Sequence, residues 1–311
     1  MIEKIYPKKL EKGDTIALVA PSSPVKETEK IEKGAEYLES LGYKVKISKG
    51  CYLSYDYLAG SDEERAKYVN EAFADKSVDA IMCVRGGYGS PRILDRLDYD
   101  LIAKNPKIFC GFSDITAMHC AIWRKTGLVT FHTPMTATCM ADGFDPDAAK
   151  SFFGLLTSEG PLGEYKNPDG SALKTICGGK ASGIFIGGNV TLCGSVCGTG
   201  YGIDWTDKIL FFEDVGENVY RIDRTLNTMR LCGAFEKCAG VVFGAFTGYE
   251  KKDDGMTIEQ VIRDLIAPYG KPVLTGASSG HIAKNMSFPI GVRAEIDADA
   301  GKLTFTERHL S

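Results

Sequence analysis

The N-terminal half of this 311-residue chain alternates short apolar runs with amphipathic segments, and this alternation constrains the fold more than any other feature. The apolar runs at 15–20, 78–84 and 107–110 are short and bounded by Gly, Pro or Ser, which is typical of buried strands. Between the first two runs, apolar residues recur at helical spacing over 31–41 and 66–73. Strands separated by helices favour a mostly parallel sheet that is covered on both faces.

Two of these helices carry start signals. Ser61 and Glu64 have the spacing of a capping box, in which each side chain accepts a backbone N–H at the helix start. Asp145 followed by Pro146 predicts an N-cap and a first-turn proline, for a helix ending near Leu156. Further helices are predicted from Pro91 and from Asp114, and further strands at 44–47 and 128–131.

The composition changes after residue 157. Residues 158–173 combine glycines and prolines with polar residues, which is typical of an interdomain linker. We therefore expect a first domain over 1–157 and a second over 174–311. The second half is predicted to contain strands at 181–186, 209–212, 241–243 and 273–274, helices over 219–229 and 258–266, and a C-terminal hairpin over 291–306. The expected fold class is α/β: an N-terminal, mostly parallel sheet flanked by helices, Rossmann-like or amidotransferase-like, with a smaller, mixed, β-rich C-terminal domain.

Charge and hydropathy exclude several classes of protein. The net charge of −4 provides no basic field for sequence-independent nucleic-acid binding. No stretch of 18 uninterrupted apolar residues is present, so no membrane span is expected. The first thirteen residues are densely charged, unlike the apolar core of a secretory signal. We expect a cytoplasmic protein with neither nucleic acid nor membrane as a partner, and a homodimer is compatible with the sequence.

The ten cysteines could form disulfides, hold a metal or remain reduced. No two of them form a C-x-x-C pair, and several lie in apolar runs, as Cys83 and Cys110 do. Cys193 and Cys197 have helical i,i+4 spacing, but no histidine lies near them to complete a zinc site. We therefore expect reduced thiols that pack as small hydrophobic side chains, and no metal site.

The sharpest local feature is Ser113, which lies between a short predicted strand and a predicted helix. A strand that turns directly into a helix through Gly111 and a serine resembles a nucleophile elbow, where the turn raises the hydroxyl above the sheet edge. Ile115 stands where the second glycine of that motif is expected. The alternative is a helix cap, in which the side chain of Ser113 or Asp114 accepts backbone N–H groups.

A second loop, Arg85 to Ser90, also joins a predicted strand to a predicted helix. Its paired glycines, Gly86 and Gly87, allow a ligand to approach the backbone closely, and their N–H groups could form an oxyanion hole. No Gly-Lys-Ser/Thr sequence follows, which argues against a phosphate-binding P-loop. The alternative is an ordinary tight turn. Both loops leave the carboxyl edge of the predicted parallel sheet, where α/β folds bind ligands.

A serine nucleophile needs a base, and the chain has four histidines. His119 is predicted inside a helix, and His309 lies near a terminus where fraying is usual. His132 ends a strand and is a second candidate for the base. His281 stands in a loop of small residues, where packing gives little reason for a histidine. Glu213 follows a buried strand and could orient that base, although an acidic turn is the alternative.

Taken together, these motifs resemble the LD-carboxypeptidases (muramoyl-tetrapeptide carboxypeptidases), in the serine peptidase class that also contains the microcin-immunity acylamidases. The likeness extends from Gly13 to Val292, nearly the whole chain. The motifs that carry it are Arg85-Gly86-Gly87-Tyr88-Gly89, Gly111-Phe112-Ser113-Asp114, Gly187-Gly188-Asn189, Glu213-Asp214-Val215-Gly216-Glu217 and Tyr220-Arg221-Ile222-Asp223-Arg224.

The resemblance implies a catalytic triad of Ser113 as nucleophile, His281 as base and Glu213 as the carboxylate that orients it. It also implies that the oxyanion candidates are the N–H groups of Gly86, Gly87 and Asp114. No metal or other cofactor is needed for this chemistry. Because the serine lies in the first expected domain and its two partners in the second, the site is expected at the domain interface.

The implied substrate is a murein tetrapeptide of cell-wall recycling, cleaved before its C-terminal D-amino acid. The free α-carboxylate calls for an Arg fork or backbone N–H groups, and Arg85, Arg221 and Arg224 are the candidates. The alternative for Arg221 and Arg224 is a charge on a helix surface or at an interface. The alternative with the same chemistry is an acylamidase of peptidyl-nucleotide conjugates, for which Trp205 and Tyr201 could stack on a base. The alternative of another class is a non-catalytic peptide-binding protein.

Overall fold

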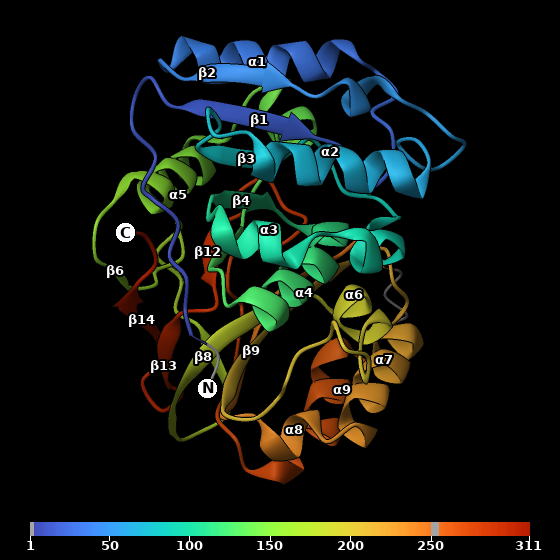
Figure 1. Cartoon of the computed structure of the whole chain (residues 1–311). Helices are drawn as coiled ribbons and strands as arrows, with labels where there is room; N and C mark the ends of the chain where they lie inside the picture. The colour runs from blue at the N-terminus through green and yellow to red at the C-terminus, as the bar shows by residue number, and fades with distance from the viewer. Residues whose placement is uncertain (1–2, 250–254) are drawn as a thin grey trace.

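The computed structural model describes residues 3–249 and 255–311, and in them two β-sheets pack side by side (Figure 1). The first sheet has the strand order β12-β5-β4-β3-β1-β2 and is parallel except at β12, which runs antiparallel to β5. Its strands are β1 (Thr15–Val19), β2 (Lys44–Ile47), β3 (Ala80–Cys83), β4 (Ile108–Gly111), β5 (Thr130–His132) and β12 (Phe288–Ile290).

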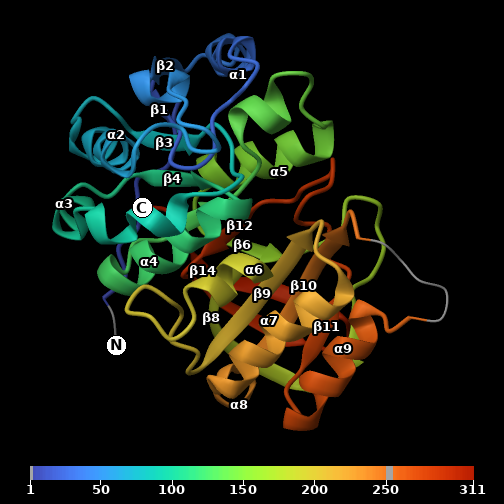
Figure 2. The same cartoon turned by 90° about the vertical axis from the view of Figure 1, so that its right-hand side faces the viewer.

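Helices cover both faces of the first sheet. Figure 2 shows α2, α3 and α4 on one face and α1 and α5 on the other. These helices are α1 (Glu29–Ser40), α2 (Asp62–Ala74), α3 (Tyr99–Lys104), α4 (Thr116–Thr126) and α5 (Pro146–Thr157). Short helical turns lie between them: η1 (Lys49–Tyr52), η2 (Ser90–Arg96), η3 (Ser113–Ile115) and the π-helical η4 (Thr136–Met140).

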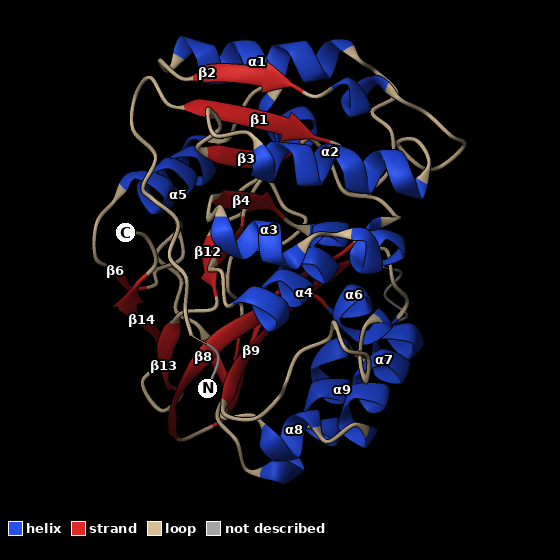
Figure 3. Ribbon diagram, in the orientation of Figure 1, coloured by secondary structure: helices blue, strands red, loops and turns tan. Residues whose placement is uncertain are grey.

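The second sheet has the order β6-β14-β13-β8-β9-β10-β11-β7, with β8 to β11 parallel and the outer strands antiparallel. Its strands are β6 (Pro161–Glu164), β7 (Lys174–Cys177), β8 (Lys180–Asn189), β9 (Lys208–Val215), β10 (Gly240–Thr247), β11 (Val273–Thr275), β13 (Arg293–Asp297) and β14 (Lys302–Arg308). Helices gather on one face of this sheet (Figures 2 and 3). They are α6 (Val190–Ser195), α7 (Val219–Leu231), α8 (Ala234–Lys237) and α9 (Ile258–Leu265), followed by the turn η5 (Ala267–Tyr269).

The predicted fold class and the strongest local signals are confirmed. The N-terminal sheet is mostly parallel and helix-covered, and the second sheet is mixed. Ser61 accepts the N–H of Glu64 while Glu64 accepts the N–H of Ser61, so the capping box forms. Asp145 caps α5 by accepting the N–H groups of Asp147 and Ala148. These signals succeed because each depends on residues within one turn.

The segment after Pro91 differs from the single helix expected there. Residues 90–96 form the 3₁₀ turn η2, and Leu97 is extended. Asp98 then accepts the N–H of Leu101 and begins the separate helix α3. Because Asp98 caps a new helix, the segment is divided into the turn η2 and the helix α3. The strand expected over 128–131 is shifted and forms β5, Thr130–His132.

The chain crosses between the two sheets more often than a simple linker implies. The segment 158–173, predicted as a linker, contains β6, which pairs with β14 at the edge of the second sheet. Its first residue is Pro161, and an edge strand tolerates a proline because one side of its backbone is unpaired. Conversely β12, within the range 174–311, pairs with β5 of the first sheet.

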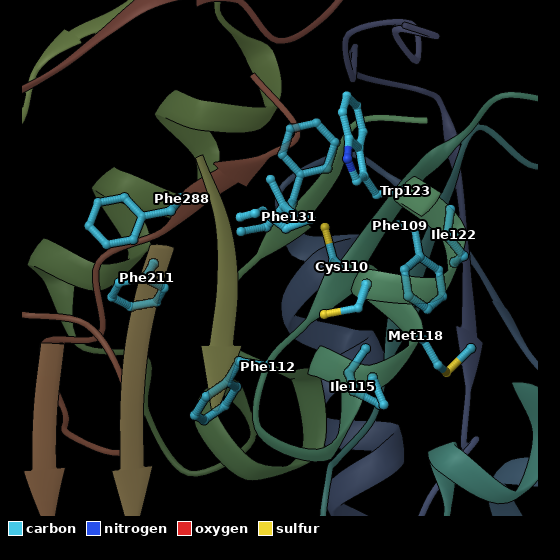
Figure 4. Packing of buried hydrophobic residues seen from close by; sticks show 14 of the residues in the cluster. Phe109, Cys110, Phe112, Ile115, Met118, Ile122, Trp123, Phe131, Phe211 and Phe288 are labelled. Carbon is cyan, nitrogen blue, oxygen red and sulfur yellow. The ribbon is translucent and has the colours of Figure 1, made fainter. Parts of the chain in front are cut away.

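Phe288 of β12 joins the cores of the two sheets. Its ring centroid lies 5.3 Å from that of Phe185, 5.1 Å from Phe211 and 5.6 Å from Phe305, all three in the second sheet. Figure 4 shows Phe288 and Phe211 side by side, with Phe131 of the first sheet nearby. Each aromatic pair contributes about 0.5–1.5 kcal/mol beyond its buried area. This shared core holds the elements of the two sheets in a fixed relation.

The ten cysteines are free thiols. Six of them are buried among apolar side chains: Cys51, Cys83, Cys110, Cys120, Cys193 and Cys238. Burial raises the pKa of the Cys110 thiol to about 12, so that thiol stays protonated at neutral pH. Among the described helices, none is both long and apolar enough to cross a bilayer.

Candidate active site

The turn after β4 gives Ser113 a left-handed backbone, with φ of 62°. A serine in this region costs on the order of 1–3 kcal/mol, and such strain persists where the surrounding structure enforces it. The helix-cap alternative is not found, because neither η3 nor α4 has a side-chain cap. The segment therefore has the strained strand-to-helix turn of a nucleophile elbow.

Ser113, His281 and Glu213 form one hydrogen-bonded chain. His281 Nε2 lies 3.0 Å from Ser113 Oγ, and His281 Nδ1 lies 2.8 Å from Glu213 Oε2. Glu213 is fully buried within β9, two residues before the strand ends. Burial raises the pKa of the Glu213 carboxyl, while the hydrogen bond from His281 opposes that rise. This geometry lets His281 accept the serine proton while Glu213 holds the ring.

The loop that carries His281 approaches Glu213 so closely that it requires a glycine. Gly280 has φ of +126°, and a Cβ built there would lie 2.7 Å from Glu213 Oε2. Asn285 accepts the N–H of Gly280 at 2.9 Å, and Ser279 donates to the carbonyl of Met286 at 2.8 Å. These bonds fix the loop on which the His281 ring stands.

The side chain of Asp114 joins three loops beneath Ser113. It is fully buried and accepts hydrogen bonds from Ser22 Oγ at 2.6 Å and from the N–H of Ser90 at 2.7 Å. Burial raises the pKa of this carboxyl, and its hydrogen bonds oppose the rise. Ser22 follows β1 and Ser90 follows the glycine loop, so Asp114 holds both against the elbow.

Arg65 of α2 supports the same loops. Its buried guanidinium donates to the carbonyls of Pro21 and Gly89 and pairs with Asp62. The sequence analysis missed the roles of Arg65 and of the Asp114 side chain. Arg65 precedes Val69 by four residues, and that spacing would have placed it on the buried face of the helix.

The glycine loop lies against the serine. A Cβ on Gly86 would lie 3.0 Å from Ser113 Cβ and 3.1 Å from Ser113 Oγ, so only glycine fits without displacing the serine. Among the described residues, the N–H groups of Gly86 and Gly87 donate to no protein acceptor. Two free backbone donors beside a serine can receive a developing oxyanion.

A cavity of about 670 Å³ opens above Ser113 and His281. One wall is formed by Arg85, Gly86 and Gly87. Its other lining residues are Phe112, Pro134, Met135, Thr138, Cys139, Gly143, Phe144, Asp145, Val215, Ile282, Ala283 and Asn285. Within residues 3–249 and 255–311, no group of three or more His, Cys, Asp or Glu side chains could hold a metal ion.

Known protein families match both halves of the chain. The LD-carboxypeptidase N-terminal domain matches residues 16–133, and the LD-carboxypeptidase C-terminal domain matches residues 182–296. The chain belongs to the LD-carboxypeptidase family. The first match contains Ser113 and the glycine loop, and the second contains Glu213 and His281.

Relatives extend the match over nearly the full length. A probable murein peptide carboxypeptidase of Bacillus subtilis is 39% identical over 295 residues, covering 94% of this chain and 91% of the relative. The structure of muramoyltetrapeptide carboxypeptidase from Oxalobacter formigenes is 28% identical with a TM-score of 0.82, covering 94% of this chain and 98% of that one. MccF, the microcin C7 self-immunity protein of Escherichia coli, in complex with glutamyl sulfamoyl guanosine, has 27% identity and a TM-score of 0.90, covering 98% and 99%.

The three arginine candidates of this LD-carboxypeptidase family member lie in different places. Arg85 lines the cavity, and its Nη1 donates to the carbonyl of Pro24 at 2.9 Å. Arg221 and Arg224 lie on α7 and flank the exposed ring of Tyr220, at 5.9 and 5.4 Å from its centroid. Neither α7 arginine is among the residues that line the cavity.

The remaining histidines are packed inside the protein. His119 Nε2 bonds to the carbonyl of Gly111 and its Nδ1 to Thr130 Oγ1, both at 2.9 Å. His132 is buried and neither ring nitrogen has a partner among the described residues. Instead of fraying, His309 is buried and bonds to the carbonyl of Leu155 at 2.7 Å, because the C-terminal segment packs against α5.

The aromatic residues considered for base stacking lie away from the cavity. Trp205 is only 6% exposed and precedes β9, whereas Glu213 stands near the other end of that strand. Tyr201 packs against Tyr99, with Lys125 Nζ 4.9 Å from its ring centroid. Neither lines the cavity, so the expectation that they stack on a substrate base is wrong for this arrangement.

Proposed function

We propose that this chain is a serine carboxypeptidase that hydrolyses the amide bond before the C-terminal D-amino acid of murein tetrapeptides, in cytoplasmic cell-wall recycling. The observation that carries the proposal is the hydrogen-bonded chain from Glu213 through His281 to Ser113 at a cavity. Membership of the LD-carboxypeptidase family supports the substrate class, because its relatives carry the names of murein peptide and muramoyltetrapeptide carboxypeptidases.

The reaction proceeds in two halves. Ser113 Oγ attacks the amide carbonyl carbon while His281 Nε2 takes its proton. The tetrahedral intermediate collapses when the imidazolium returns that proton to the leaving nitrogen, which releases the D-amino acid and leaves an ester on Ser113. Water then attacks the ester with His281 as base, and the proton returns to Ser113 Oγ as the shortened peptide departs.

The negative oxygen of each tetrahedral intermediate needs hydrogen-bond donors. We assign this role to the N–H groups of Gly86, Gly87 and Asp114. The close approach of Gly86 to Ser113 and the free donors of the glycine loop support the assignment. Donors held by the fold stabilise the developing charge without having to reorganise.

Arg85 is the proposed cation for a substrate carboxylate. It lines the cavity, and its guanidinium could bind a carboxylate through two parallel N–H groups. Arg221 and Arg224 are proposed as surface charges, since both lie beside Tyr220 and Arg221 forms an exposed ion pair with Glu217 at 3.4 Å.

A second candidate is an acylamidase that cleaves peptidyl-nucleotide conjugates. The TM-score of 0.90 to MccF with bound glutamyl sulfamoyl guanosine favours it. The same triad would attack the aminoacyl bond of such a conjugate. The third reading, a non-catalytic peptide-binding protein, is disfavoured by the intact Ser113–His281–Glu213 chain.

One incubation separates these functions. The protein is mixed with a murein tetrapeptide or with an aminoacyl sulfamoyl-adenosine, and the products are identified by mass spectrometry. Release of D-Ala from the tetrapeptide is the expected result, and the Ser113→Ala variant should lose about 10⁶-fold in kcat. Cleavage of the conjugate alone would favour the acylamidase, and no cleavage of either would contradict the enzyme.

Three further features stay predictions. The division into domains over 1–157 and 174–311 is tested by limited proteolysis within 158–173. Cytoplasmic location is tested by cell fractionation. Homodimeric assembly is tested by analytical ultracentrifugation.

A further inference from the structure

Phe112 lies beside the base of the triad as well as beside the nucleophile. It directly precedes Ser113, and its ring centroid lies 4.7 Å from that of His281, with 48° between the two ring planes. The residue is 6% exposed and lines the catalytic cavity. The phenyl ring therefore contacts the side chain that carries positive charge during the proposed reaction.

The hydrogen bonds of His281 leave one motion of its ring open. Nδ1 bonds to Glu213 Oε2 at 2.8 Å, and Nε2 bonds to Ser113 Oγ at 3.0 Å. Bonds at the two nitrogens fix the line that joins them, but the ring can rock about this line because hydrogen bonds tolerate a range of angles. A side chain packed against the ring restricts that motion. Phe112 is such a side chain.

The distance between the two centroids requires one ring to present a face to the other. Rings that meet edge to edge, with carbons about 3.5 Å apart, have centroids about 6 Å apart. The observed 4.7 Å is too short for that arrangement. The face of a phenyl ring holds the negative part of its quadrupole and attracts a cation within about 6 Å of the centroid. A face of Phe112 turned to His281 favours the imidazolium over the neutral ring.

Two further rings hold Phe112 in place. The centroid of His132 lies 5.7 Å from that of Phe112 and 5.2 Å from that of Phe211. His132 and Phe211 are both fully buried. Burial lowers the pKa of His132 well below its usual value, so its ring is neutral at pH 7 and does not repel an imidazolium at His281.

The other titratable groups near His281 come from several elements. Glu213 of β9 accepts its Nδ1–H. Arg85, Cys139 and Asp145 line the same cavity. All of these groups stay in place when the phenyl ring alone is replaced, so a change in the titration of His281 would report the loss of that ring.

We propose that Phe112 is a positioning residue of the reaction: its ring restricts the His281 ring and stabilises the imidazolium that forms when His281 takes the proton of Ser113. The inference rests on the proposed function, since it uses the proton transfer of that mechanism. Because His281 is neutral before the attack, the stabilisation acts in the transition state and not in the bound ground state. The ring should therefore raise kcat with little effect on KM.

Replacement of the phenyl ring tests the effect on turnover. We expect Phe112→Leu, which keeps an apolar side chain, to release D-Ala with kcat about 3- to 30-fold lower and KM within about twofold. A ring-fluorinated phenylalanine at position 112 keeps the shape but withdraws charge from the ring face, so it should lower kcat in the same direction by a smaller factor. This variant also serves if Phe112→Leu fails to fold, which thermal unfolding checks.

Phe109→Leu is the matched control. Phe109 is also buried, and its ring lies 5.6 Å from that of His119, a histidine outside the triad. Its side chain lies apart from that of Phe112 (Figure 4). The kcat of Phe109→Leu should stay within about twofold of the wild type.

A titration of the free protein tests the charge effect without turnover. The imidazole resonances of His281, identified by their loss in His281→Gln, are followed by NMR against pH. The titration midpoint should lie about 0.5–1.5 pH units lower in Phe112→Leu than in the wild type, which is the same 3- to 30-fold factor on a logarithmic scale. Phe109→Leu should leave the midpoint unchanged.

Wild-type kcat in Phe112→Leu would overturn the inference. A midpoint that is unchanged or higher would overturn it as well, because the phenyl ring would then not favour the imidazolium. Failure of the proposed function has a different signature, since the wild-type protein would release no D-Ala while the His281 titration could still respond to Phe112→Leu.

Discussion

Replacing Glu213 with Gln isolates the electrostatic contribution of a buried carboxylate to catalysis. The substitution keeps the size of the side chain and removes its charge. Glu213 Oε2 is 2.8 Å from His281 Nδ1, and the carboxylate is fully buried. In the transition state His281 becomes an imidazolium, so the carboxylate is attracted to a charge that the resting neutral ring lacks.

The magnitude follows from the distance. Two unit charges 2.8 Å apart, at an effective dielectric constant of about 20, attract each other by about 6 kcal/mol. At 1.36 kcal/mol per factor of ten, that energy corresponds to a loss of about 10⁴-fold in kcat. A Gln side chain can also donate to Nδ1, which leaves the proton on Nε2 and prevents His281 from accepting the proton of Ser113.

The same substitution should not destabilise the fold at neutral pH. Burial raises the pKa of Glu213 in the folded protein above its unfolded value. A carboxyl with a raised folded pKa supports folding below its unfolded pKa, and this contribution is lost as the pH rises through the folded pKa. At pH 7 the ionised group therefore opposes folding, and the free energy of unfolding of Glu213→Gln should equal or exceed that of the wild type.

Steady-state kinetics of D-Ala release, paired with urea unfolding at pH 7, measure both effects. Asp214→Asn is the matched control, because the Asp214 carboxylate is also buried but accepts hydrogen bonds from Asn189 and Thr191 outside the triad. It should lower stability far more than Glu213→Gln and kcat far less. A Glu213→Gln enzyme within tenfold of wild-type kcat would refute the reasoning.

Three other outcomes follow from the geometry. Gly86→Ala should lower kcat by about 10²-fold with little change in KM, because its Cβ would press on Ser113 and shift the oxyanion donors; unchanged kinetics would contradict this. Arg85→Ala should raise KM for the tetrapeptide, while Arg221→Ala and Arg224→Ala should leave KM within about twofold of the wild type. A larger rise in KM for the α7 variants than for Arg85→Ala would place the carboxylate site on α7. Burial lowers the pKa of His119 to about 4, so its contribution to stability is present above pH 6.5 and is lost as the pH falls towards 4. Urea unfolding at pH 7 and pH 4 should show a smaller loss of stability in His119→Gln than in the wild type.

The sequence predicted the helix starts correctly where the capping bonds lie within one helical turn. The capping box of Ser61 and Glu64 and the cap at Asp145 form as predicted, because each bond closes within three residues. The sequence indicates a turn at Ser113 but does not decide between a helix cap and a nucleophile elbow. Cap and elbow use the same residue types, and the φ of 62° that separates them depends on the surrounding packing.

Longer-range placements needed the folded chain. The burial of Trp205 and the pairing of β12 with the first sheet have no local signature. Arg65 shows a narrower limit: its spacing from Val69 indicates the buried face of α2, but only the folded chain shows that its guanidinium bonds to two loop carbonyls.

The sequence alone determined the alternating α/β order and the absence of a basic field, because strand and helix periodicity and net charge are properties of the chain itself. The proposed triad of Ser113, His281 and Glu213 came from the resemblance to a known family, since the residues by themselves left a helix cap and an acidic turn open. The tertiary structure alone decided that Ser113 and His281, 168 residues apart, meet at 3.0 Å. That relation depends on packing between the two sheets, where contacts such as those of Phe288 join segments that no local pattern connects.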